Sequence, residues 1–439
     1  MRFKVLLLCA AAAMPAAASA NELLHAYELA QQNDMQFQAA AAQRDANIEA
    51  KPQARAAFLP QINGSYMRGR DFENTTPSNP AFGPARHDVF TSDGLKATLT
   101  QTIFDWQAFE RLKQSDIEVA FAAAQYNAAQ QDLIKRVAQA YFDVLSAADS
   151  LRSSQAEKSA LDRQLDQAKQ RFDVGLAAVT DVQDAQARAD LTAAALIQAE
   201  QNLSNAQDAL AVVTGETSKL TTLKDDFLLP LPAPANAESW VASAKQGNFD
   251  LQAAQLQADM YKRGIDMAWA KHLPTVGLMA SISDGKQGGL FGATQNDRQI
   301  QLQVNVPIFS GGATQSGVRQ AKATQAQYQA MYEGQKRLTE QQTRSAYLGV
   351  VSGALRVKAL KQAVLSNTTA LSATQTGMEV GTRTSLDVLN AQQQLYSSQR
   401  DYYKSRYDYL VSFLQLKAAA GTLTVQDLNT VDGLLIAAP

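Results

Sequence analysis

Two very long segments of the chain have the polar and apolar spacing of coiled-coil helices. No proline occurs between residues 105 and 229 or between residues 309 and 438. Residues 105–172 alone would extend about 100 Å as one helix, so they must pack along their length against other helices. Apolar residues recur every seven positions, as in coiled coils. They are Val182, Ala189, Leu196, Leu203 and Leu210 in the first segment, and Val388, Leu395, Tyr402, Tyr409 and Leu416 in the second.

A short sequence interrupts each long segment, and its two copies are similar. Residues 171–186 contain Val174-Gly175, Asp181-Val182 and Ala185-Gln186, and residues 377–392 contain Val380-Gly381, Asp387-Val388 and Ala391-Gln392. Each pair recurs at the same offset, because 381 minus 175, 387 minus 181 and 391 minus 185 all give 206. Gly215 and Gly421, at the same offset, are expected to cap the returning helices. The duplication predicts two helical hairpins, and we call the copies the first and second elbow.

Four segments alternate between polar and apolar residues and predict strands. They are residues 61–66, 95–100, 275–282 and 299–306, with exposed loops expected at 71–93 and 285–297. In the last strand one face carries Ile, Leu and Val and the other carries Gln and Asn, as expected for a water-filled lumen. Four strands cannot close a membrane barrel, so a membrane-spanning sheet would need at least two subunits, without a choice among two, three and four.

The remaining segments complete a duplicated plan. Short helices are expected at 22–32 and 238–245. Two longer helices are expected, one at 34–58 and one that starts near 248, and they end at Leu59-Pro60 and Leu273-Pro274. We expect a first repeat at 21–215, with strands at about 61–70 and 94–104 and a hairpin at about 105–215. A linker follows at 216–247. The second repeat spans 248–421, with strands at about 275–284 and 298–307 and a hairpin at about 311–421, before a tail at 422–439.

The amino terminus has the pattern of a secretory signal. Arg2 and Lys4 precede an apolar run, and residues 18–20 form a small-residue cleavage site, so residues 1–20 are expected to be removed. The only cysteine, Cys9, lies in that segment, which leaves no disulfide or thiol chemistry. No later run approaches the apolar length of a membrane helix. An exported chain of this kind is a soluble protein or an outer-membrane β-barrel.

Composition argues against nucleic-acid binding and catalysis. The net charge of the full chain is −2, and removing Arg2 and Lys4 leaves 38 basic against 42 acidic side chains, with no basic footprint for nucleic acid. The histidines His25, His87 and His272 lack metal-ligand spacing. No phosphate-binding loop or nucleophile elbow is present, so we expect neither an enzyme nor a cofactor.

Two aspartates follow the elbow glycines and allow two interpretations. Asp181 and Asp387 lie in the first turns of the returning helices, where aspartate stabilises a helix start. In a ring of identical subunits, one inward carboxylate per chain, such as that of Asp387, would form a charged constriction that favours cations. The sequence leaves both interpretations open.

These motifs resemble the TolC family of outer-membrane export channels. The resemblance is carried by Ala140-Tyr141-Phe142-Asp143-Val144-Leu145, Arg163-Gln164-Leu165-Asp166-Gln167, Arg171-Phe172-Asp173-Val174-Gly175-Leu176 and Val380-Gly381-Thr382-Arg383-Thr384, together with Leu59-Pro60-Gln61 and Gly421-Thr422-Leu423. It covers essentially the whole chain after the signal. It implies an α+β homotrimer in the outer membrane of a Gram-negative bacterium. Four strands per chain would form a twelve-stranded transmembrane β-barrel, continued by a twelve-helix periplasmic α-barrel with an equatorial mixed region.

The resemblance also implies partners and a gate. The partners are outer-membrane lipid, a periplasmic adaptor protein, and an inner-membrane ABC transporter or proton-driven drug pump. Adaptor contact is expected at the elbows, at Val174, Gly175, Leu176, Val380, Gly381 and Thr382. Asp387 matches a selectivity ring, and Arg383 and Asp181 match residues that hold the aperture shut. The chain departs at Asn390, where relatives have a second aspartate, and at Met378, where they have a tyrosine.

The expected function is therefore a passive exit duct for efflux and type I secretion, gated at the elbows. The alternative is a soluble periplasmic coiled-coil adaptor or structural protein. That alternative predicts one hairpin and a soluble β domain, whereas this sequence has two hairpins and two strand pairs.

Overall fold

The computed structural model describes residues 22–79, 81, 83–216, 221–224, 229–288 and 292–437. The predicted signal peptide, with Cys9, lies outside the described residues. The chain divides into two compact units. The helical unit comprises Met1–Ala39, Ala128–Asn248 and Thr339–Pro439, and the sheet unit comprises Ala40–Asn127 and Phe249–Leu338. Each unit takes segments from both halves of the sequence.

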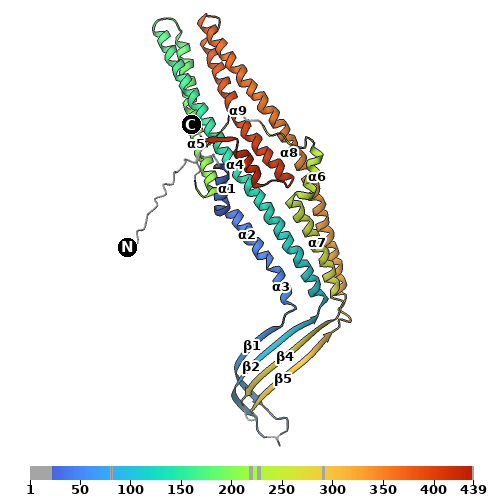
Figure 1. The fold of residues 1–439 in the computed structure, drawn as a ribbon. Coiled ribbons are helices and arrows are strands. Elements are labelled where there is room, and N and C mark those ends of the chain that lie inside the picture. The colour runs from blue at the N-terminus through green and yellow to red at the C-terminus, as the bar shows by residue number, and fades with distance from the viewer. Residues whose placement is uncertain are drawn as a thin grey trace, which may run out of the picture. The chain divides into compact units, whose positions relative to one another are not determined.

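The sheet unit is built on one antiparallel four-stranded sheet. Its strands are β1 (Gln61–Thr75), β2 (Arg86–Phe104), β4 (Thr275–Gln287) and β5 (Ala293–Asn305), in the order β1-β2-β4-β5 (Figure 1). The central β2–β4 pair joins the two halves of the sequence, with Gly94 opposite Gly285.

The strands extend into segments that were expected to be loops. Asp71 pairs with Phe90 and Thr75 with Arg86, so the predicted loop at 71–93 is wrong over most of its length, and His87 lies in β2. The loop predicted at 285–297 is also mostly strand, because Gly285 pairs with Gln295 and Gln287 with Ala293. Backbone pairing maintains these ladders, and side-chain bonds between Ser92 and Asp71 and between His87 and Asn74 add to it across β1 and β2. Exposed ladders accept the polar residues and glycine that the sequence pattern associates with turns.

Neither face of the sheet is covered by the described part of the chain. On β5, the apolar side chains Ile300, Leu302 and Val304 are exposed, and so is Gln303 on the opposite face. A sheet in a water-soluble domain buries its apolar face against another layer. This sheet therefore requires a different environment for its apolar face.

Three helices flank the strands in the sequence. The single helix predicted at 34–58 is wrong, because the chain forms α2 (Met35–Ile48) and α3 (Ala50–Ala56) with a turn at Glu49. Pro52 explains the interruption, since it has no N–H to donate to the carbonyl of Ile48. The third helix, α7 (Phe249–Ala270), ends before Pro274.

Long helices form two hairpins. α4 (Trp106–Asp173) and α8 (Ala313–Glu379) have 68 and 67 residues, and they return as α5 (Val179–Thr214) and α9 (Ser385–Ala419). Every member of the two seven-residue series is buried or half-buried, which confirms the coiled-coil interpretation. Gly215 and Gly421 have φ of 83° and 72°, which confirms both predicted glycine caps.

The helical unit also contains the short elements. These are α1 (Glu22–Asn33), α6 (Ala237–Gly247), α10 (Val425–Asp432), β3 (Thr221–Leu223) and β6 (Leu435–Ala437). β3 pairs with β6, so the linker and the tail share a small sheet. Within the described residues, no helix combines the length and the apolar composition needed to cross a membrane.

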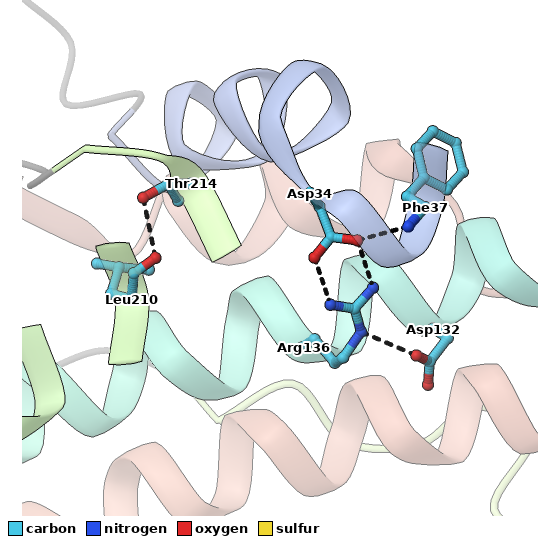
Figure 2. A network of polar contacts seen from close by, with 6 residues as sticks. All are labelled: Asp34, Phe37, Asp132, Arg136, Leu210 and Thr214. Atoms are coloured by element: carbon cyan, nitrogen blue, oxygen red, sulfur yellow. Dashed lines mark hydrogen bonds and ion pairs between the residues drawn. The ribbon is translucent and has the colours of Figure 1, made fainter. Parts of the chain in front are cut away.

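A buried ion pair attaches the start of α2 to α4. Asp34 is 4% exposed and accepts hydrogen bonds from Arg136 Nη1 at 2.6 Å and Nη2 at 3.0 Å (Figure 2). It also accepts the backbone N–H of Phe37 at 2.6 Å and so caps α2. Arg136 Nε donates to Asp132 at 2.9 Å.

Figure 2 also shows a hydrogen bond within the last turn of α5, where the Thr214 hydroxyl donates to the Leu210 carbonyl at 2.9 Å.

Candidate functional site

The first elbow is a tight turn that depends on one glycine. α4 ends at Asp173, and Gly175 has φ of 76°, the left-handed region that other residues avoid. The Gly175 N–H donates to the Phe172 carbonyl at 2.9 Å, and the Leu176 N–H donates to the Arg171 carbonyl at 2.7 Å. These bonds satisfy the last carbonyls of α4 and redirect the chain into α5.

The second elbow has the same geometry. Gly381 has φ of 78°, and its N–H donates to the Met378 carbonyl at 3.2 Å. The Thr382 N–H donates to the Gly377 carbonyl at 2.8 Å. Each donor and acceptor lies 206 positions after its counterpart in the first elbow. The sequence duplication is therefore a duplication of one turn structure.

The tips of both elbows are exposed and partly apolar. Val174, Leu176 and Val380 are 68%, 71% and 69% exposed, and Thr382 is also exposed. The two tips lie at the same end of the helical unit (Figure 1). Together they present an apolar surface that the described residues of this chain leave uncovered.

Both elbow aspartates act at helix starts. Asp181 accepts the Ala178 N–H at 3.2 Å. Asp387 accepts the Thr384 N–H at 2.9 Å and the Thr384 hydroxyl at 3.0 Å, and its own N–H donates to that hydroxyl at 3.2 Å. This reciprocal arrangement is a capping box. The backbone and hydroxyl donors of Thr384, with a smaller contribution from Arg383, hold the pKa of Asp387 below its usual value.

A pocket of about 260 Å³ lies between the two elbows. From the residues predicted for the gate and for adaptor contact it brings together Leu176, Asp181, Met378, Gly381 and Arg383. Asp387 and Asn390 are not part of its lining and lie further along α9. Sequence reasoning missed Arg171, which lines the pocket from the last turn of α4. The lining thus contains two guanidinium groups and one carboxylate.

A small apolar cluster supports the elbows. It consists of Leu161, Leu165, Ala168, Ala185, Ala189 and Leu389, with Val182 packed against it. These residues come from α4, α5 and α9, so the first hairpin and the returning helix of the second pack together. Alanines in the cluster allow close approach of the helices.

A polar contact missed by sequence reasoning connects the two returning helices. Arg188 on α5 donates from Nη2 to Asn390 Oδ1 at 2.9 Å and from Nη1 to Gln393 Oε1. Asn390, noted in the sequence only as a departure from relatives, is thus a partner of Arg188. The partners are more than two hundred positions apart, and no local pattern in a single sequence links them.

Further contacts join α9 to α4. The Tyr396 hydroxyl donates to the Ala156 carbonyl at 3.3 Å, and Arg400 donates to Glu157 at 2.5 Å. The Tyr407 hydroxyl donates to the buried Asp149 at 2.7 Å. Burial and the neighbouring Asp149 charge both raise the pKa of Tyr407.

The chemistry available at the elbows is electrostatic and mechanical. Within the part of the chain that the structure describes, no group of three or more His, Cys, Asp or Glu residues could hold a metal ion. Capped helix starts, a glycine turn in each elbow and a shared pocket lined by two arginines and one carboxylate can hold or release a closed arrangement of helices.

The comparisons with known proteins fit this architecture. The family model described as "Outer membrane efflux protein" matches residues 26–216 and 240–422. The chain is 36% identical over 425 residues to "Outer membrane protein TolC" of Vibrio cholerae, covering 95% of both chains. It is 31% identical to "Alkaline protease secretion protein AprF" of Pseudomonas aeruginosa, covering 93% of this chain and 86% of that protein.

A solved structure has the same fold. The Campylobacter jejuni CmeC outer membrane channel superimposes with a TM-score of 0.78 at 16% identity, covering 94% of this chain and 89% of that chain. At this identity the likeness concerns the fold alone.

Proposed function

The chain belongs to the outer membrane efflux protein family, and we propose that it is a passive exit duct of the outer membrane, gated at its two elbows. In this role it accepts cargo from a periplasmic adaptor and an inner-membrane pump and performs no catalysis. Similarity to a protein named for alkaline protease secretion supports a role in type I secretion as well as efflux.

The single observation that carries the proposal is the two-sided exposure of the sheet. From residue 299 to its end, β5 presents Ile300, Leu302 and Val304 on one face and uncharged Gln and Asn side chains on the other, and the described chain covers neither face. Lipid outside and water inside would satisfy both faces. Four strands per chain are too few to close around water. Three copies, the number that the family resemblance implies, would form a twelve-stranded barrel.

We propose that the chain consists of two structural repeats, 21–215 and 248–421, joined by the linker 216–247 and followed by the tail 422–439. The same family model matches 26–216 and 240–422, which supports this division. The identical geometry of the two elbows also supports it. In a trimer the repeats would give six elbows around one opening.

The elbow pocket supports a gate. Asp181 lines it together with Arg383, and an attraction between these charges would hold the two hairpins of a protomer, or neighbouring protomers, closed. Asp387 would place one carboxylate per chain at the opening, as a selectivity ring. The exposed elbow tips, at Val174, Leu176 and Val380, supply apolar area for an adaptor.

Cell fractionation followed by conductance measurement tests the proposal. The full chain is expected in outer-membrane vesicles and should require detergent for extraction. Purified protein should then give discrete ion-conducting steps in planar lipid bilayers. Recovery in the periplasmic fraction without detergent would contradict the duct and favour the soluble coiled-coil adaptor.

A further inference from the structure

The contact of Arg188 with α9 has two properties that suit a gate. Among the side-chain hydrogen bonds that join α9 to the first hairpin, it lies nearer the elbows than those of Tyr396 and Arg400, since Asn390 precedes both along α9. It is also formed by a full positive charge with two neutral amides. We propose that Arg188 is a positioning residue that clamps α5 to α9 and lowers the cation preference of the mouth, an inference that rests on the proposed channel function.

The geometry of the contact matches a clamp. Asn390 and Gln393 lie three positions apart on α9, so their side chains are neighbours on one helix face. The guanidinium group of Arg188 is a rigid planar fork, and each of its two Nη atoms donates to one of these amides. A lysine at the same position has no fork and would bind the two amides less well.

The clamp differs in exposure from the contacts further along α9. Asn390 and Gln393 are exposed, whereas Glu157, the partner of Arg400, is 7% exposed, and Asp149, the partner of Tyr407, is 5% exposed. When an exposed hydrogen bond to a neutral partner breaks, water replaces it and the free-energy cost is small. When a bond to a buried carboxylate breaks, the charge is left unpaired and the free-energy cost is large. The Arg188 contact should therefore break first, while the buried contacts hold the rest of α9 in place.

Arg188 also binds α9 about one helical turn from the proposed selectivity ring. Asn390 follows Asp387 by three residues, about 4.5 Å along the helix axis. The neutral amide partners leave the positive charge of Arg188 uncompensated at Asn390, on the turn of α9 that follows Asp387. One unit charge changes the local preference for an ion that passes about 4 Å away in water about fivefold, so an arginine at the mouth should oppose the cation attraction of Asp387.

Recordings on the full-length protein in planar bilayers separate the two roles. In Arg188→Lys and Asn390→Ala the positive charge remains but the clamp is weakened. Both should increase the open fraction about three- to tenfold, with an unchanged reversal potential in a salt gradient. In Arg188→Gln the charge is lost as well, and the cation-to-anion permeability ratio should rise about fivefold.

A matched control is Arg356→Ala, an exposed arginine on α8 well before the second elbow, which should behave as wild type in both measurements. A wild-type open fraction in both Arg188→Lys and Asn390→Ala would overturn the clamp. A wild-type permeability ratio in Arg188→Gln would overturn the charge role. Failure of the proposed function is distinguishable, because the wild-type protein itself would then conduct no ions.

Discussion

Asp34 gives a sharp test of the packing of the helical unit. In Asp34→Asn the amide oxygen can still accept the Phe37 N–H, so the cap of α2 is partly kept. The charge that faces Arg136 is lost, and an amide N–H₂ replaces one acceptor of the guanidinium group. The substitution therefore removes the ion pair while the side-chain volume stays almost unchanged.

The expected loss of stability depends on how deeply the Asp34–Arg136 pair is buried. Breaking a fully buried ion pair costs about 3–5 kcal/mol, and an exposed pair contributes about 0.2–1 kcal/mol. The Asp34 side chain is 6% exposed, but that of Arg136 is 27% exposed and keeps its bond to Asp132. We expect a loss of about 2 kcal/mol, which raises the equilibrium constant for local opening, and with it the exchange, about 30-fold.

Hydrogen exchange measured by mass spectrometry reports this opening directly, in the peptide that covers the start of α2. Asp45→Asn on the same helix is the matched control, because Asp45 is 64% exposed and pairs with Arg44. The control should change exchange by less than about twofold. If Asp34→Asn accelerated exchange no more than Asp45→Asn does, the buried pair would contribute little and the reasoning would be wrong.

The effect should also depend on pH in a defined direction. Hydrogen bonds from Arg136, with smaller contributions from backbone N–H groups, outweigh burial and hold the pKa of Asp34 below its usual value. A carboxyl group whose pKa is lowered by folding stabilises the protein above its unfolded pKa of about 3.9. That contribution is lost as the pH falls through the folded pKa. Wild type and Asp34→Asn should therefore differ fully at pH 7 and converge in acid.

Three further predictions concern the elbows. Arg383→Ser should increase channel conductance, because it removes a positive group from the pocket that Asp181 shares, and unchanged conductance in bilayers would remove Arg383 from the latch. Met378→Tyr should lower the open fraction by adding a hydroxyl that can bond Asp181, and a wild-type open fraction would show that no such bond forms. Gly381→Val should speed hydrogen exchange at the second elbow and reduce copurification of an adaptor, because a β-branched residue is strained at φ of 78°. Gly64→Val is the control, because the φ of Gly64 is not positive.

Much of the fold could be predicted because the local spacing of apolar residues differs between helices and strands. The seven-residue spacing through Leu210 and Leu416 and the alternation from residue 299 to 306 each report which side chains share a face. The ends of β1 and β2 could not be predicted in this way. Residues such as Thr75 and Arg86 belong to strands through backbone pairing, which leaves no pattern of burial in the side chains.

The elbows could be predicted from the sequence because the chain contains them twice. The contacts around them could not be predicted. Gly175 and Gly381 require positive φ, and their repetition marks the turns. Arg188 has no such mark, because its partners on α9 are brought near only by the folded hairpins. The same holds for Asp34 and Arg136. Pro52, in contrast, was a local signal for the break between α2 and α3 that the helical spacing concealed.

The most direct test of the central claim is the block of wild-type and Asp387→Ala conductance by multivalent cations added at the side of the elbows. If the elbows form the mouth and Asp387 lines it, wild-type conductance should fall as the cation is added, and Asp387→Ala should lose both the block and much of the cation selectivity. Equal block and equal selectivity in the two proteins would show that Asp387 only caps α9 and that the selectivity ring lies elsewhere.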